Sequence, residues 1–294
     1  MIYLKLVLTA VFWGGNFVAG RMVAQELPPF SISFVRFAIA TLFLLAFILR
    51  SHVRVPALKK EHLLAAFLLG MTGVFANNSL FFYGLQTVPA GRASLITANN
   101  PAWIAIFASL IFREPMTLPK ITGICLSVLG AMVVISHGDP ISIFLGEVGL
   151  GELCLVGSGM SWVIYSLLGR WAMKELSPLE AVTYASVIGT MALFPPAALE
   201  GVTEAFWHYG LTEWAAIIYM AFFGTVLAFV WYNEGIKAIG PSRASIFINL
   251  VPISAIIMAV LLLGETADAS LLLGAALVTS GIYLTNRPPR VSRA

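Results

Sequence analysis

Four asparagines in apolar surroundings are the side chains of this sequence best suited to recognise a ligand. They form two adjacent pairs, Asn77–Asn78 and Asn99–Asn100, and the second pair lies in the segment TANNPAW beside Pro101 and Trp103. Carboxamides donate and accept hydrogen bonds, and an indole ring stacks on planar or cationic groups. These residue types indicate reversible binding of a small polar or aromatic molecule.

Two further tryptophans stand near the middle of apolar segments, although Trp normally gathers at membrane interfaces. Trp13 and Trp162 either pack against nearby glycines as scaffold or line a cavity. The amides either join helices or face a wet cavity, and we favour the cavity because neighbouring helix positions point about 100° apart. The candidate substrate-binding residues are Asn77, Asn78, Asn99, Asn100, Trp103, Trp13, Asn16, Trp162, Tyr165 and Tyr83.

Arg36 is the one basic residue well inside an apolar segment. A charge there costs about 2.5–3.5 kcal/mol on insertion scales. It could bind a substrate carboxylate, but we favour a structural interpretation, in which it anchors neighbouring carbonyls or snorkels toward the interface. No Asp or Glu stands at mid-depth, which favours export driven by the substrate gradient over proton antiport.

Motifs of covalent or nucleotide chemistry are missing from the sequence. It contains no P-loop, HExxH zinc motif, nucleophile elbow or full GxGxxG, and its two cysteines form no CxxC. We therefore expect no enzymatic activity, no cofactor, no metal and no nucleic-acid partner.

The composition places the candidate residues in a lipid bilayer. Hydrophobic residues make up 59% and charged residues 11% of the chain, whereas a globular domain has about 25% charged residues. A helix needs about 20 apolar residues to span the bilayer. The pattern predicts an all-α integral membrane protein with ten transmembrane helices, at residues 3–24, 30–49, 62–86, 92–112, 118–136, 151–171, 178–199, 212–236, 242–263 and 269–286.

The basic residues orient these spans. Of the 17 Lys and Arg residues, 14 fall on the side of the N-terminus, Arg21 and Arg92 fall on the other side, and Arg36 lies within a span. Cytoplasmic loops are enriched in Lys and Arg. Both termini are therefore predicted to be cytoplasmic.

An internal repeat divides the chain into two halves. Trp13, Gly20 and Arg21 recur 149 residues later, and nine residues between Gly73 and Gly130 recur 151 residues later. Because each half has five helices, the second half enters the membrane from the opposite side, as in many secondary transporters. We predict a first five-helix repeat over 1–137, a second, inverted repeat over 147–286 and a basic cytoplasmic tail over 287–294.

The repeat also separates shared residues from those specific to one half. Pro101 recurs as Pro252, which predicts a shared kink in the fourth and ninth helices. Asn99, Asn100 and Trp103 are replaced in the second half, so symmetry does not require them.

Several motifs resemble those of the drug/metabolite transporter superfamily and its ten-helix EamA family, most of all the YddG-type aromatic amino acid exporters. They are FWGGNFVAGR, VPAGRASLITANNPAW, REP, GPSRASIFINLVPI and GE. The resemblance implies a basket-like bundle with a central cavity lined by helices one, three, four, six, eight and nine. An Arg in the second helix is widespread in this family, which supports the structural interpretation of Arg36.

Together these features predict a secondary transporter of the bacterial inner (plasma) membrane that exports small amphiphilic metabolites by alternating access. Aromatic amino acids are the leading substrates, because tryptophans and amides suit a ring and a zwitterion. One alternative is export of drugs or quaternary cations through cation–π attraction. Another is a membrane scaffold or receptor. The expected partners are a small-molecule substrate and the lipid bilayer, and the choice between monomer and homodimer stays open.

Overall fold

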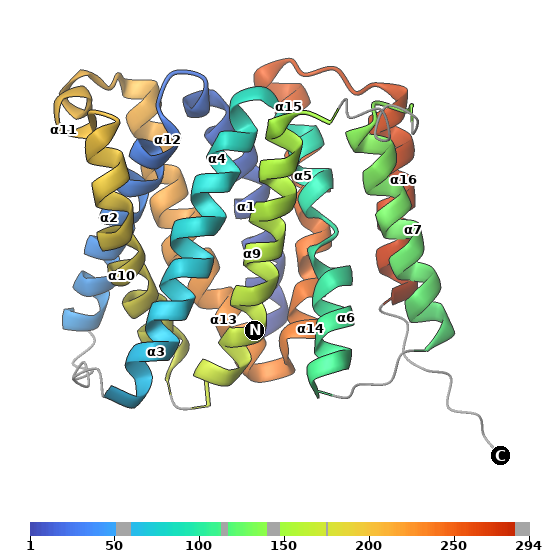
Figure 1. Cartoon of the computed structure of the whole chain (residues 1–294), viewed down its shortest axis with the longest axis horizontal. Coiled ribbons are helices and arrows are strands. Elements are labelled where there is room, and N and C mark those ends of the chain that lie inside the picture. The colour runs from blue at the N-terminus through green and yellow to red at the C-terminus, as the bar shows by residue number, and fades with distance from the viewer. Residues whose placement is uncertain (51–59, 113–116, 140–147, 175, 286–294) are drawn as a thin grey trace.

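The chain folds into a bundle of helices that run side by side (Figure 1). The computed structural model describes residues 1–50, 60–112, 117–139, 148–174 and 176–285, and these residues contain no strand. The main helices are α1 Ile2–Ala24, α2 Pro29–Arg50, α3 Lys60–Leu69, α4 Asn77–Thr87, α5 Ala90–Thr97, α6 Asn100–Phe112, α7 Leu118–Ile135, α9 Leu150–Ala172, α10 Pro178–Leu199, α11 Val202–Ala205, α12 Leu211–Ala221, α13 Ala228–Ile239, α14 Pro241–Ser245, α15 Leu250–Leu263 and α16 Ala269–Thr285.

Eight helical stretches within the described ranges are long and apolar enough to cross a membrane. They are Ile2–Ala24, Pro29–Arg50, His62–Thr87, Ala90–Ile111, Leu150–Ala172, Pro178–Leu199, Leu211–Ile239 and Pro241–Leu263. Two shorter apolar helices, Ile121–Ile135 and Ala269–Gly281, lie in α7 and α16, where the fifth and tenth spans are predicted. The prediction of an all-α membrane protein is confirmed, and the number of ten spans stays a prediction.

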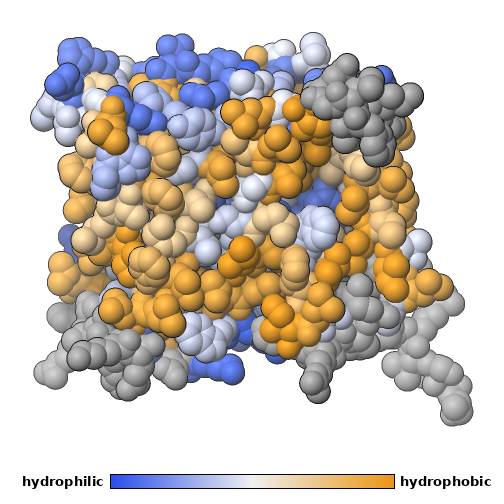
Figure 2. Space-filling view, viewed as in Figure 1, coloured by the Kyte–Doolittle hydropathy of each residue, from blue (hydrophilic) through white to orange (hydrophobic). Residues whose placement is uncertain are grey.

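Large apolar side chains cover much of the outside of the bundle. Leu42, Leu49, Leu110 and Leu261 are all strongly exposed. Figure 2 shows hydrophobic residues in a broad band across this face, with hydrophilic residues gathered along its upper edge. Lipid tails solvate such a surface, whereas water would not. The chain is a multi-pass membrane protein.

Two spans contain a π-helical turn at corresponding places in the two halves. Gly70–Ala76 joins α3 to α4, and Phe222–Leu227 joins α12 to α13. A π turn disturbs the regular hydrogen-bond ladder of a helix, and polar side chains bond the carbonyls near it. Asn78 Nδ2 donates to Gly73 O at 3.0 Å, and Thr225 Oγ1 donates to Met220 O at 3.0 Å. The two turns therefore bring polar groups into apolar helices.

Two other spans are interrupted just before a proline. α5 ends at Thr97 and α6 begins at Asn100, while the 3₁₀ turn Ile246–Asn249 separates α14 from α15. Pro101 and Pro252 follow these interruptions. Proline has no N–H to donate and its ring crowds the carbonyl four residues earlier. The helix breaks lie where the shared prolines predict a kink.

Glycines let the first helix of each half approach the π turn of the other half. Gly224 lies against the amide of Asn16, and Gly73 lies against the ring of Tyr165. Asn16 and Tyr165 are 149 residues apart, and the two glycines are 151 residues apart. In both places a Cβ on the glycine would overlap the facing side chain. The same close approach therefore occurs twice in the molecule.

Candidate functional site

A cavity lies at the centre of the bundle, next to the π turns and the helix breaks. We call it the central cavity. Its walls include all six helices that the family resemblance implies and, in addition, α2. The lining residues are Trp13, Asn16, Phe17, Arg36, Asn77, Asn78, Phe81, Ser94, Thr97, Ala98, Asn100, Ser158, Trp162, Phe229, Ile248, Val251 and Pro252. Arg36 is the one charged side chain in this described lining.

Six of the ten candidate residues line the central cavity, and the other four lie elsewhere. Tyr165 is fully buried behind Trp162, with the two rings stacked at 4.9 Å between centroids. Tyr83 is exposed on the bundle surface and meets the ring of Phe30 edge-on. Asn99 and Trp103 line a different cavity. The six lining candidates are Trp13, Asn16, Asn77, Asn78, Asn100 and Trp162.

The other cavity, which we call the lateral cavity, lies between α5, α6, α7 and α9. Asn99, Asn100 and Trp103 face mostly apolar residues of α7 and α9 there. The Oδ1 of Asn99 is buried and has no hydrogen-bond partner in the described structure. Asn100 lines both cavities. It stands between the two spaces at the start of α6.

Four amide side chains are among the residues that line the central cavity. Asn77 Nδ2 donates to the carbonyl and the hydroxyl of Ser158, at 2.9 and 3.0 Å. Asn78 is bound to the π turn before it. Asn16 and Asn100 are both largely buried, and Asn16 Oδ1 has no hydrogen-bond partner among the described residues. Because buried polar groups normally have partners, this oxygen is available to accept a hydrogen bond from a ligand.

Arg36 lies deep in the bundle, with 3% of its surface exposed. Its Nε donates to Thr225 Oγ1 and its Nη1 donates to Asn78 Oδ1, both at 3.1 Å. The expectation that it snorkels outward is wrong, because the guanidinium is buried. It does hold a neighbouring carbonyl, that of the Asn78 amide, together with the hydroxyl of Thr225. Thr225 in the second π turn and Asn78, two residues after the first π turn, supply side-chain oxygens that solvate the charge inside the bundle.

Aromatic rings also line the central cavity. Trp13 and Trp162 meet edge-on at 5.1 Å between centroids, and Phe229 meets Trp162 edge-on at 5.2 Å. Trp13 Nε1 donates to Gly224 O at 3.0 Å, which ties the indole to the second π turn. Phe17 and Phe81 line the cavity as well, with centroids 5.0 Å apart.

The two halves contribute different chemistry at equivalent positions. Where the first half places polar residues on the central cavity, the second half places apolar ones 151 residues later. The pairs are Asn78 with Phe229, Thr97 with Ile248, and Asn100 with Val251. Phe229, Ile248 and Val251 are missing from the sequence-based candidates. Adding 151 to Asn78 and Asn100 finds Phe229 and Val251, whereas Ile248 corresponds to Thr97, which is not among those candidates. The cavity is amphipathic as a result.

Hydrogen bonds and an ion pair hold the upper end of the bundle. The Glu265 carboxylate accepts from the N–H groups of Ala90 and Gly91, at 2.8 and 3.1 Å, and so caps α5. Arg92 pairs with Asp268 at 2.8 Å. A hydrogen bond from the backbone N–H of Leu271 and, to a smaller extent, the nearby Arg92 charge hold the pKa of Asp268 below its ordinary value.

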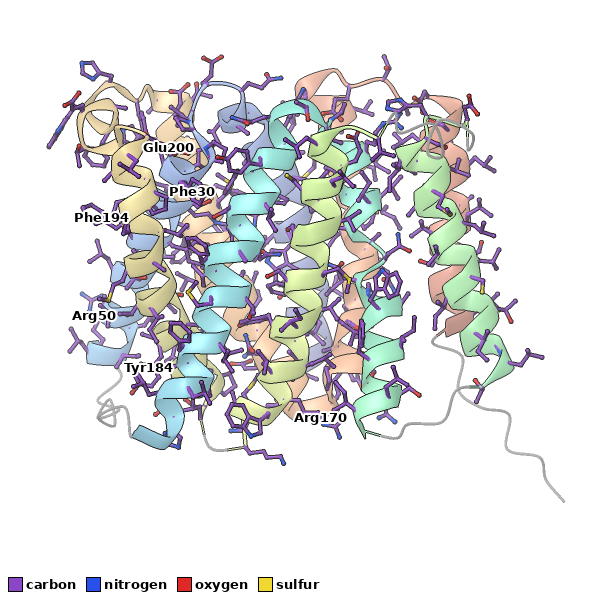
Figure 3. All side chains as sticks on the ribbon, in the orientation of Figure 1. Phe30, Arg50, Arg170, Tyr184, Phe194 and Glu200 are labelled. Carbon is purple, nitrogen blue, oxygen red and sulfur yellow. The ribbon has the colours of Figure 1, made fainter. Side chains whose placement is uncertain are left out.

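The labelled side chains in Figure 3 show the polarity of the two ends. Arg50 and Arg170 lie toward the lower end, whereas Glu200 and Phe30 lie toward the upper end. Glu200 accepts from the N–H and the hydroxyl of Ser31, at 2.7 and 2.8 Å, and this bond fixes the start of α2 to the end of α10. The two labelled arginines thus lie at the opposite end of the bundle from the Glu200 carboxylate.

The chain is similar to known transport proteins over nearly its whole length. The sequence profile described as the EamA-like transporter family matches residues 1–136 and 149–287. The chain is 30% identical to the "Uncharacterized transporter YyaM" of Bacillus subtilis, over 99% of this chain and 95% of that one. It is 28% identical to a "Probable terminal-alkyne amino-acid exporter" of Streptantibioticus cattleyicolor, over 96% and 92%.

Two more similarities cover nearly the whole chain. A "Probable amino-acid metabolite efflux pump" of Salmonella typhimurium is 26% identical, over 97% of this chain and 95% of that one. A solved structure titled "Crystal structure of protein" has the same fold, with a TM-score of 0.68, 18% sequence identity and 96% of each chain covered.

Proposed function

Since this chain belongs to the EamA-like transporter family and is a membrane transporter rather than an enzyme, we propose that it exports small amphiphilic metabolites by alternating access. Aromatic amino acids are the leading substrates. Two similar proteins are named as amino-acid exporters or efflux pumps, which supports this class of cargo.

The amphipathic central cavity is the observation that carries the proposal. Amides and Arg36 line this cavity together with the rings of Trp13, Trp162 and Phe229. An α-amino acid with a large side chain combines the same two kinds of surface, a charged head and an apolar body. Ligand sites typically combine an apolar lining with a few placed polar groups, and this cavity has that composition.

The architecture we propose for this function is ten spans in two inverted repeats, at 1–137 and 147–286, in a bacterial inner membrane. The π turns, the helix breaks and the glycine contacts recur in both halves, which supports the repeat. The end of the bundle where Arg50 and Arg170 lie then faces the cytoplasm together with both termini. The proposed tail at 287–294 lies outside the described residues.

Flux through the purified protein tests the proposal. Proteoliposomes are loaded with labelled Phe, Trp, Thr or a quaternary ammonium ion, and efflux is followed with and without a pH gradient. We expect efflux of Phe and Trp above that of protein-free liposomes, unchanged by the gradient because no carboxylate lines the described cavity. Efflux of the quaternary ammonium alone would favour the drug-exporter alternative. If none of these solutes leaves the liposomes, the proposal that the protein exports small amphiphilic metabolites is rejected.

A further inference from the structure

We infer that Arg36 is the binding site for a carboxylate group, so that the transporter selects molecules that carry one. The inference rests on the proposed function, because it specifies which part of the cargo the central cavity recognises. It also distinguishes amino acids from quaternary cations, which the aromatic lining alone does not.

The first argument is the missing counter-ion. Arg36 is 3% exposed, and no carboxylate oxygen among the described residues lies within 4.0 Å of its guanidinium nitrogens. Its partners are the neutral oxygens of Thr225 and Asn78. A charge inside a membrane protein is costly and normally pairs with an opposite charge or marks a substrate path. An incoming anion supplies the charge that the protein lacks.

The second argument is the geometry of the donors. A guanidinium carries five N–H donors in a planar fork, which suits a carboxylate. Two of these donors are engaged by Thr225 and Asn78. Arg36 also lines the central cavity. Three of the five donors thus have no hydrogen-bond partner among the described residues, while the two hydrogen bonds fix the position of the guanidinium.

The third argument is what surrounds the fork. Asn16 and Arg36 contact consecutive residues of one π turn, Gly224 and Thr225. Asn16 Oδ1 is buried without a partner among the described residues, and it offers an acceptor to the ammonium of a zwitterion. Trp13 also binds Gly224, through its indole N–H. The π turn at Gly224 and Thr225 is therefore contacted by the Arg36 guanidinium, the Asn16 amide and the Trp13 indole.

The same charge disfavours a cationic cargo. A quaternary ammonium in the central cavity meets the Arg36 charge with no lining carboxylate to offset it. Repulsion between like charges is strong where water is scarce. Cation–π attraction to Trp13 acts against that repulsion but supplies no negative charge that would neutralise Arg36.

Competition against labelled L-phenylalanine tests the inference on the unmodified protein. The competitors are 3-phenylpropionate, which keeps the carboxylate, and L-phenylalaninamide and 2-phenylethylamine, which lack it. We expect phenylpropionate to compete about 10- to 100-fold better than the amide and the amine, because hydrogen bonds to a charged group contribute on that scale. Equal competition by all three would overturn the inference and leave the proposed function standing.

Variants then assign the selectivity to Arg36. Arg36→Gln should weaken phenylalanine binding about 10-fold or more and abolish the preference for phenylpropionate, whereas Arg36→Lys should keep the preference. Arg21→Gln is the matched control, because Arg21 bonds the carbonyl of Leu85 outside the central cavity. Thermal unfolding checks that each variant folds.

The possible results are distinguishable. If labelled phenylalanine does not bind or move at all, the proposed function fails, and the inference fails with it. If phenylalanine binds but Arg36→Gln keeps the preference for carboxylates, the inference alone is wrong. If Arg36→Gln does not fold, the ranking of competitors on the unmodified protein and on Arg36→Lys decides: a carboxylate preference in both supports the inference, and its absence from either contradicts it.

Discussion

Asn100 is the residue that most clearly links the sequence to the proposed site. It begins α6, just after the break at Ala98 and Asn99, and it lines both the central and the lateral cavity. Trp103 stands three residues later and lines only the lateral cavity. The two residues were equal candidates in the sequence, and the structure separates them.

Replacement of Asn100 by Ala should raise the apparent Km for phenylalanine about 2- to 10-fold, because one hydrogen bond of net 0.5–1.5 kcal/mol is lost. Trp103→Ala should leave Km within twofold, since Trp103 does not line the central cavity. Uptake kinetics in proteoliposomes measure both. A larger effect for Trp103→Ala than for Asn100→Ala would place the substrate in the lateral cavity instead.

The depth of a side chain could be predicted from the sequence, but its direction could not. Counting residues along each helix places Trp13, Trp162 and the four asparagines near the middle of the bundle. Direction depends on an unbroken helical phase, and a break or a π turn shifts that phase for every later residue. This is why Trp103 lies away from the central cavity and why the depth of Arg36 gave no hint of its partners.

At the scale of elements, the irregular helices are what create the cavity. The helix breaks have a sequence signal, because Pro101 and Pro252 cannot continue the hydrogen-bond ladder. The π turns had none beyond the repeated glycines, Gly73 and Gly224. A π turn leaves backbone carbonyls without their regular helical partners. In the second π turn the distant Trp13 side chain donates to one such carbonyl, that of Gly224.

Gly224 offers a direct test of the contact between the halves. Its Cα faces the Asn16 amide so closely that a Cβ would overlap it. Overpacking of this kind costs about 1–3 kcal/mol, so Gly224→Ala should lower the thermal unfolding temperature and reduce transport. Gly157→Ala is the matched control, because a Cβ there meets only the end of the Leu80 side chain, at 3.2 Å. Equal stability of the two variants would show that the contact is not tight.

At the scale of the whole molecule, two similar halves enclose an asymmetric cavity. Recurrent glycines, prolines and π turns give both halves the same bends. The side chains on the central cavity differ, since Asn78, Thr97 and Asn100 are replaced by apolar residues in the other half. We interpret the shared bends as the parts that let the halves move against each other, and the differing side chains as the parts that hold the cargo.

The division into shared bends and differing side chains could be predicted from the sequence, because the residues that recur between the halves include the glycines and prolines at the bends. A helical membrane protein could also be predicted, because a helix satisfies its backbone hydrogen bonds internally, as the hydrocarbon core of a bilayer requires. The sequence did not reveal that polar positions of the first half and the equivalent apolar positions of the second half line one cavity. That fact depends on how α1 and α9 pack against the opposite halves.

Counterflow of phenylalanine tests alternating access by the central cavity most directly. Proteoliposomes are preloaded with unlabelled phenylalanine and diluted into a trace of labelled phenylalanine, with no ion gradient. A carrier that exposes one site to each side in turn predicts transient accumulation of the label above its external concentration. Entry of label that only equilibrates, and is unaffected by the unlabelled phenylalanine inside, would contradict the account.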